Sequence, residues 1–273
     1  MVSGDSRKSI SISGRLWKLM MYRNAKSRRN ITNQLSSCAN DAHRTQICCA
    51  SLRRLFRRYV CLRNNASMKT VWIVIFTVVL VWSGIGPKDY FTWVLEVAPA
   101  IIGFAILAVT YNRFRLTNIL YVFILLHCIV LMVGGHYTYA EVPLFDYLKP
   151  IIGFERNNYD KVGHFMQGFV PALIAREILI RKKVLNSKRW LNFLVVSVCL
   201  AFSAFYELIE WLVAVSTGES AEAFLGTQGY VWDTQTDMAL ALIGSISALI
   251  ILAGLHDSQL KNITKSSSGP AAA

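Results

Sequence analysis

Residues 159–165 read YDKVGHF and join a tyrosine and two opposite charges directly to a histidine and an apolar segment. Two later stretches have the same character. Residues 206–211, YELIEW, lie near the end of one apolar run, and residues 232–237, WDTQTD, begin the last one. Ionisable side chains within or beside membrane-spanning segments are costly and usually mark function. The three stretches therefore indicate where a site lies, and the apolar runs around them decide the fold.

Composition places the chain among membrane proteins. Its 273 residues are 54% hydrophobic, with a mean hydropathy of +0.40, which is too apolar for an ordinary soluble domain. The net charge of +13 belongs to one segment, because residues 1–69 hold 15 Lys and Arg against two acids, whereas residues 70–273 hold 14 of each sign. We therefore expect a lipid bilayer around the fold and no nucleic-acid partner.

The basic segment at residues 1–67 is rich in Ser, Arg and Asn and has no sustained helical or strand period. We expect it to be disordered, and three interpretations compete. It is a cytoplasmic arm that touches anionic lipid or RNA, an Arg/Ser-rich targeting peptide, or upstream sequence read from a start codon placed too early. The third is favoured, because Met68 leads directly into a membrane span.

The rest of the chain alternates apolar runs with short polar joints and predicts an all-α bundle. A helix needs about 20 residues to cross a ~30 Å hydrocarbon core, and lipid requires every backbone group to be paired internally. We predict a domain of six transmembrane helices over residues 68–260, followed by a disordered tail at residues 261–273. The expected spans are residues 70–86, 91–111, 117–136, 160–180, 190–212 and 234–254.

Basic residues in the joints predict the orientation. Arg113, Arg115 and the basic joint at residues 181–189 alternate with joints that are poorer in Lys and Arg, and residues 213–233 contain neither. The positive-inside rule then places both termini in the cytoplasm. The joints at residues 137–158 and 213–233 are expected on the outer side.

This topology brings the three charged stretches to one depth near the outer ends of their helices. Each carries two ionisable residues three or four positions apart, on one helix face. Glu96 and His136, near the outer ends of the second and third spans, could join them. We predict a site made of His164, Glu207, Glu210, Asp233 and Asp237, with Tyr159, Asp160 and Lys161 at its mouth.

So many carboxyl groups cannot all ionise in a low dielectric without a cation, shared protons or water. One interpretation is a divalent metal. Oxygen ligands favour Mg, Ca or Mn, and a histidine ligand would also allow Zn to bind. The candidate ligands are His164, Glu207, Asp233 and Asp237. A second interpretation is general acid–base chemistry on a lipid-linked or amphiphilic substrate from the outer leaflet.

Two other interpretations involve no reaction. In one, a hydrogen-bonded network with Lys161 paired to the acids only holds three helices in register. In the other, the carboxylates relay protons or cations in a small transporter. Arg176 and Glu177 are the ionisable residues expected in the inner halves of the spans, near their edge, and this scarcity argues against a relay.

Other residues carry weaker signals. His127, in the middle of the third span, is interpreted as an interior imidazole. Arg176 and Glu177 are interpreted as side chains that snorkel to the inner interface, and His256 carries no signal. The chain has no GxxxxGK[ST] loop, no HExxH helix and no GxSxG elbow, which argues against an ATPase, a zinc protease or a common serine hydrolase. The spacing of its six cysteines matches no zinc ribbon or CxxC pair.

The motifs at residues 159–165, 207–211 and 229–237, in this order and at helix ends, resemble the YjdF-like family of bacterial inner-membrane proteins. The resemblance covers residues 68–260 and implies a multi-pass protein of the inner membrane. That family has no assigned activity, so the resemblance implies a location and no reaction. Residues 1–67 have no counterpart in it.

A looser similarity is to VanZ-like membrane proteins, which share the Asp-Lys-x-x-His-Phe helix start and a later Asp-x-x-x-Asp. They are associated with glycopeptide-antibiotic tolerance and the cell envelope, a link that rests on analogy. We therefore expect an inner-membrane protein whose outward-facing polar site takes a lipid-like or amphiphilic envelope ligand.

Overall fold

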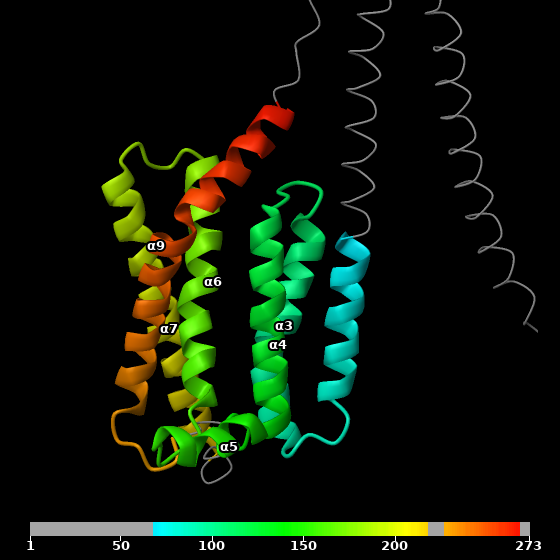
Figure 1. The fold of residues 1–273 in the computed structure, drawn as a ribbon, viewed down its shortest axis with the longest axis vertical. Helices are drawn as coiled ribbons and strands as arrows, with labels where there is room; N and C mark the ends of the chain where they lie inside the picture. Colours follow the sequence, from blue (N-terminus) through cyan, green and yellow to red (C-terminus); the bar gives the residue numbers. More distant parts are fainter. Residues whose placement is uncertain (1–67, 218–226, 268–273) are drawn as a thin grey trace, which may run out of the picture. The chain divides into compact units, whose positions relative to one another are not determined.

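The computed structural model describes residues 68–217 and 227–267 (Figure 1). The chain divides into two units, residues 1–70 and residues 71–273, and the helices after Ser83 belong to the second. The basic segment at residues 1–67 lies outside the described residues, so its disorder and its origin stay predictions. The described residues contain seven helices and no strand, which confirms the all-α class.

The helices follow one another with short joints. Their bounds are Met68–Ser83, α3 (Tyr90–Thr110), α4 (Asn118–Tyr137), α5 (Pro143–Ile152), α6 (Tyr159–Arg181), α7 (Lys188–Thr217) and α9 (Asp233–Ser267). Four are long and apolar enough to cross a membrane: α3, α4, α7 and the part of α9 at Asp233–Ile263. Helix Met68–Ser83 is shorter, and α6 carries more polar side chains. Length and apolar composition therefore support four of the six predicted spans. The spans at Met68–Ser83 and α6 stay predictions.

Two helices extend further than expected. α7 ends at Thr217, although its span was predicted to end at residue 212, and α9 continues to Ser267, although its span was predicted to end at residue 254. The tail that we expected to be disordered from residue 261 therefore begins as helix. The span boundaries were predicted from long apolar runs. The amphipathic sequence after residue 254 contains no such run, so the continuation of α9 was not predicted.

The sequence analysis missed α5 inside the joint at residues 137–158. Pro143 occupies its first turn, and Gly153 ends it in the left-handed conformation, with φ 79°. At ten residues it is too short to register as a span. Figure 1 shows α5 lying across the end of the bundle at which α6 begins.

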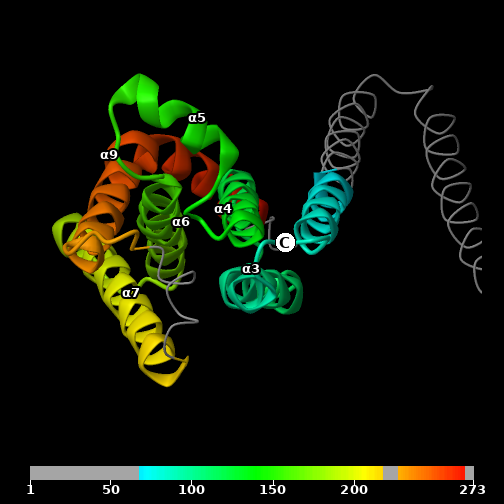
Figure 2. The same cartoon turned by 90° about the horizontal axis from the view of Figure 1, so that it is seen from below.

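α6 is the central helix of the bundle. It packs against α4, α7 and α9, whereas α3 packs against α4 (Figure 2). The backbones of α6 and α9 come into direct contact, because a Cβ added to Gly168 would lie 1.8 Å from the carbonyl oxygen of Ala241, and one added to Gly244 would lie 2.2 Å from that of Phe165. This close packing places the start of α9 beside the start of α6.

Apolar side chains cover the outside of the bundle. Val109 on α3, Phe202 on α7 and Ile250 on α9 are among the large hydrophobic side chains that are more than half exposed. A soluble protein rarely leaves so much apolar surface uncovered. The pattern is that of helices whose outer faces contact lipid.

Candidate functional site

A cluster of ion pairs joins the beginnings of α6 and α9. Lys161 Nζ lies 2.7 Å from Asp233 Oδ1, 2.8 Å from Asp237 Oδ1 and 3.3 Å from Asp160 Oδ2. All three carboxylates are buried. The i,i+4 spacing of Asp233 and Asp237 places both on the face of α9 that meets α6. One lysine therefore serves three carboxylates that come from two helices.

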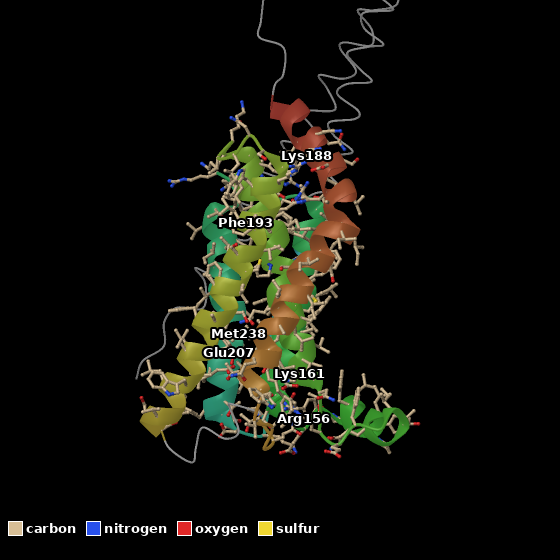
Figure 3. All side chains as sticks on the ribbon, turned by 90° about the vertical axis from the view of Figure 1, so that its left-hand side faces the viewer. Arg156, Lys161, Lys188, Phe193, Glu207 and Met238 are labelled. Carbon is tan, nitrogen blue, oxygen red and sulfur yellow. The ribbon has the colours of Figure 1, made fainter. Side chains whose placement is uncertain are left out.

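Arg156 completes this cluster, and the sequence analysis missed it. Its guanidinium bonds to Asp160 Oδ2 at 2.5 Å and to Asp233 Oδ1 at 2.7 Å. The ring of Tyr230 lies 5.5 Å from the guanidinium carbon and 5.8 Å from Lys161 Nζ. Arg156 lies one helical turn before Asp160, and this spacing was the available signal, although Arg156 precedes the helix and was assigned to a loop. Figure 3 shows Arg156, Lys161 and Glu207 towards one end of the bundle and Lys188 at the other.

Asn157 fixes the loop that presents Arg156. Its backbone N–H donates to Gln228 Oε1 at 3.0 Å, and Gln228 Nε2 donates back to the Asn157 carbonyl at 2.8 Å. Its side chain donates to the carbonyl of Val142 and to Asp146 Oδ1 at the start of α5. The loop before α6, the segment before α9 and α5 are thus tied together at a fully buried asparagine.

Tyr159 contributes to packing at the start of α6. Its hydroxyl donates to the Val130 carbonyl of α4 at 3.1 Å, and its ring packs against Phe145 and Tyr139. It was predicted at the mouth of the site with Asp160 and Lys161. Its side chain contacts α4, Tyr139 and α5, whereas the side chains of Asp160 and Lys161 join the ion-pair cluster.

A second layer lies one turn further along α6. His164 Nδ1 is 3.8 Å from Glu207 Oε1 on α7, and His164 Nε2 is 3.7 Å from Asp237 Oδ2 on α9. His164 Nδ1 is also 3.1 Å from Gln167 Oε1. Glu207 is 7% exposed, and its Oε1 has no hydrogen-bond partner within the described part of the chain. The three helices thus bring an imidazole and two carboxylates together, at distances too long for direct hydrogen bonds.

A cavity with a volume of ≈ 110 Å³ adjoins this layer. Acidic, phenolic and imidazole side chains line much of it: Glu96, Glu210, Tyr139, Tyr206, His127 and His164. Tyr206 donates to Glu96 Oε2 at 3.4 Å, across 110 residues of sequence. Asp160 also lines the cavity, so the cavity connects the ion-pair cluster with the deeper carboxyl groups.

Two histidines lie in places opposite to those expected from the sequence. His127 lines the cavity, and His136 is not part of its lining. His136 was expected to join the site, but its Nδ1 lies 3.0 Å from the Ser83 carbonyl and its ring centroid lies 4.6 Å from that of Trp82, with the rings tilted by 31°. His127 was interpreted as an interior imidazole, and it lines the cavity. The difference follows from helix rotation, which spacing along one helix does not determine.

A second buried polar cluster lies at the opposite end of α6. Glu177 Oε2 accepts from the Thr117 hydroxyl at 2.8 Å and lies 3.0 Å from His256 Nε2, and its Oε1 accepts from Arg181 Nη1 at 2.7 Å. Glu177 and His256 are fully buried. The interpretation that Glu177 snorkels to the interface is therefore wrong, and His256, which carried no signal in the sequence, belongs to this cluster.

Arg176 belongs to the same cluster. Its Nη1 lies 3.2 Å from His256 Nδ1, and its Nη2 donates to Asp257 Oδ1 at 2.7 Å. A guanidinium only donates hydrogen bonds, so His256 accepts at Nδ1 and donates from Nε2 to Glu177. Arg176 is 6% exposed, so it does not snorkel. Residues that appeared unrelated in the sequence thus tie α4, α6 and α9 together.

The fold and the apolar outer surface define a polytopic α-helical membrane protein. Residues 68–258 match the family described as "Predicted membrane protein (DUF2238)", and the chain belongs to this family. The chain is 50% identical to the Inner membrane protein YjdF of Escherichia coli (strain K12) over 185 residues, which cover 68% of this chain and 88% of that relative.

These comparisons confirm the resemblance to the YjdF-like family and the assignment to the inner membrane as a multi-pass protein. No solved structure matches the chain. The similarity to VanZ-like proteins stays a prediction. The relative's name gives a location and no reaction, so the function must be argued from the site.

Proposed function

We propose that this inner-membrane protein binds a lipid-like or amphiphilic ligand of the envelope in the cavity beside His164, Glu207 and Glu210. The observation that carries the proposal is the cavity itself. It adjoins buried carboxyl groups from α3, α6 and α7 and reaches Asp160 at the beginning of α6. Buried polar walls are costly unless a partner satisfies them, and a bound headgroup supplies such a partner.

The wall indicates the chemistry of that headgroup. Glu96, Glu210, Tyr139 and Tyr206 offer oxygen atoms, and no Lys or Arg occurs among the described residues that line the cavity. Hydroxyl and ammonium groups donate hydrogen bonds to such oxygen atoms, whereas a bare phosphate would be repelled by the carboxylates. A headgroup with hydroxyl or amine substituents fits this wall best.

The orientation in the proposal follows from the basic joints. Arg181 Nη1 donates to the Arg115 carbonyl at 2.6 Å, so the basic joint after α3 adjoins the basic joint after α6. The positive-inside rule assigns this end to the cytoplasm and the cavity end to the outer face. With helix Met68–Ser83 and α6 counted as spans, the proposal has six transmembrane helices and both termini inside.

α5 offers a route from the bilayer. Leu144, Tyr147 and Ile151 lie on one face of this helix and are 61%, 69% and 64% exposed. The other side is anchored, because Phe145 packs on Tyr159 and Asp146 accepts from Asn157. An amphipathic helix of this kind lies in the membrane interface, which would place lipid headgroups beside the loop that carries Arg156.

Transport is a second candidate, and one observation favours it. The polar cluster around Glu177 and His256 supplies ionisable groups at the opposite end of α6, where the sequence indicated few. Between the two clusters, however, α6 buries an apolar layer that includes Val170, Ala172 and Leu173. A relay of protons or cations would have to cross this layer, so ligand binding at the cavity is the stronger proposal.

Photolabelling tests the proposal. The protein is reconstituted in vesicles with phosphatidylethanolamine or phosphatidylglycerol probes that carry a photoreactive group near the headgroup, and the adducts are mapped by mass spectrometry. We expect adducts at the cavity that fall several-fold in Glu210→Gln and in Tyr206→Phe. Tyr90→Phe, at an exposed tyrosine at the start of α3, is the matched control and should leave cavity labelling unchanged. Labelling spread evenly over the lipid-facing surface, and equal in all variants, would contradict the proposal.

A further inference from the structure

The acidic residues of the site fall into two groups that differ in how their charge is compensated. Asp160 and Asp233 each lie within ion-pair distance of both Arg156 and Lys161. Asp237 gives only one oxygen, Oδ1, to Lys161. Its other oxygen, Oδ2, faces His164. Oδ2 of Asp237 therefore needs a different source of positive charge, and so does Glu207 on α7.

Glu207 shows this need most clearly. It is 7% exposed, its Oε1 has no hydrogen-bond partner within the described ranges, and the same oxygen lies 3.8 Å from His164 Nδ1. An orphaned carboxylate oxygen in a buried place costs free energy. Direct pairing with His164 would remove this cost, yet the helices hold the two groups apart.

We propose that His164, Glu207 and Asp237 hold a divalent transition-metal cation. One ligating atom from each of these residues lies within 4.8 Å of the others. Two ligands about 2.1 Å from one tetrahedral ion are ~3.4 Å apart. The gap of 3.7 Å between His164 Nε2 and Asp237 Oδ2 is a few tenths of an ångström wider, so an inward movement of the side chains, with Glu207 turning towards the same ion, closes the set.

Gln167 supports the imidazole. Its Oε1 lies 3.1 Å from His164 Nδ1 and accepts a hydrogen bond from the tautomer that carries its proton there. That tautomer leaves Nε2, the nitrogen that faces Asp237, free to ligate. Metal-binding histidines are commonly oriented through their other ring nitrogen in this way. Gln167 is a positioning residue for the proposed site.

The ligand set determines the class of ion. One nitrogen and two carboxylate oxygens suit Zn²⁺ or Mn²⁺ better than Mg²⁺, which prefers oxygen ligands and retains water. Two carboxylates and a neutral imidazole carry a charge of −2, which a divalent cation neutralises. Three protein ligands also leave a coordination position, and His164 itself lines the cavity. The inference deepens the proposed function. It rests on that function only for the identity of the ligand that the ion would contact in the cavity.

Metal binding is measured on full-length protein that carries no histidine tag, stripped with a chelator and kept in detergent. Zn²⁺ and Mn²⁺ are titrated by calorimetry, and bound metal is counted by elemental analysis. We expect one equivalent per chain, with affinity at least ~10-fold weaker in Glu207→Gln, His164→Gln and Asp237→Asn, and ~10–100-fold weaker in Gln167→Ala. His136→Gln is the matched control, because this histidine lies outside the cluster, and it should bind as the wild type does.

Two further measurements keep the inference testable if a ligand variant fails to fold. Co²⁺ added to the stripped wild type should give the visible absorption of a low-coordinate site with nitrogen and oxygen ligands, and saturating Zn²⁺ should raise the melting temperature. No stoichiometric binding by the wild type, or unchanged binding in all three ligand variants, would overturn the inference. If the cavity is photolabelled by lipid but no metal binds, the metal site is wrong and the proposed lipid ligand stands. If metal binds but the cavity is not labelled, the proposed lipid ligand is wrong and the metal site stands.

Discussion

Glu177 on α6 and His256 on α9 form a fully buried pair, with Glu177 Oε2 3.0 Å from His256 Nε2. Thr117 donates to the same carboxylate from both its backbone and its hydroxyl, so the carboxylate also holds the beginning of α4. Arg181 supplies the neutralising charge at 2.7 Å. A single carboxylate thus fixes three helices at the end of the bundle opposite the cavity.

Replacing Glu177 by Gln should destabilise the protein strongly. The change leaves Arg181 without its carboxylate, and breaking a buried ion pair by removing one partner costs about 3–5 kcal/mol. The melting temperature in detergent measures the loss. Glu141→Gln is the matched control, because it and its partner Lys88 are 52% and 47% exposed and their pair is expected to contribute at most about 1 kcal/mol. Equal losses in both variants would contradict the role given to Glu177.

This cluster also shows where sequence reasoning stops. The spacing of Asp233 and Asp237, or of Asp160 and His164, fixes which residues share a helix face, and the structure brings these faces together. Glu177 and His256 are 79 residues apart on different helices, and neither carries a local signal. Their contact depends on how α6 and α9 rotate and cross, which no spacing within one helix specifies.

The other features that the sequence did not predict, the contacts of Arg156 and the helix α5, have similar causes. Arg156 lies in a loop whose course is set by Asn157 and Gln228, so its contact with Asp233 could not be read from periodicity. α5 is ten residues long and was hidden in a joint defined only by its lack of a long apolar run. The three charged stretches were recognised because charge beside apolar segments is rare, and that signal gives depth along the helices without giving contacts.

Lys161→Met should destabilise the end of the bundle at which α6 begins, and adding Asp237→Asn should recover part of the loss. The single variant leaves Asp237 buried without its cation, whereas Asp233 keeps Arg156. Removing the orphaned charge as well relieves the penalty, so the two changes should be markedly non-additive. A cycle of melting temperatures for the two single variants and the double variant measures the coupling.

Lys88→Met provides the comparison for Lys161. Lys88 pairs with Glu141 at the surface, where its side chain is 47% exposed. Its loss should cost no more than about 1 kcal/mol. Additive effects of Lys161→Met and Asp237→Asn would mean that the lysine acts through packing alone.

The contribution of Asp146 to stability should disappear at acid pH. The hydrogen bond from Lys149 is the main cause that lowers the pKa of Asp146 below its ordinary value of 3.8, and Asn157 adds to it. A carboxyl group whose pKa is lower in the folded state stabilises that state above the ordinary pKa and ceases to do so as pH falls through the folded-state value. The side chains of Asp146 and Lys149 are 42% and 32% exposed, so solvent screens the pair and the contribution is expected to stay below about 1 kcal/mol.

The melting temperatures of the wild type and of Asp146→Asn, compared from pH 7 down to pH 3, test this sign. The wild type should be the more stable at pH 7, and the difference should shrink towards zero at the acid end. Lys149→Met should show the same pattern, because it removes the other half of the pair. A difference that grows as pH falls would mean that Asp146 is destabilising when ionised.

Gly168→Ala should separate α6 from α9, because the new methyl group would lie 1.8 Å from the Ala241 carbonyl oxygen and 2.5 Å from its carbon. Backbone atoms cannot move aside as a flexible side chain can, so the helices themselves must shift. Overpacking of this kind costs about 1–3 kcal/mol or more. Gly103→Ala is the matched control, since no atom lies within 4 Å of its added Cβ and alanine favours a helix over glycine by about 1 kcal/mol in water.

The two glycine variants should therefore change the melting temperature in opposite directions. Gly168→Ala should also weaken metal binding at His164 and Asp237, which lie on the two helices that it forces apart, whereas Gly103→Ala should leave that binding unchanged. A Gly168→Ala protein with wild-type stability would mean that α6 and α9 are not in backbone contact, and the juxtaposition of Lys161 with Asp233 and Asp237 would then need another explanation.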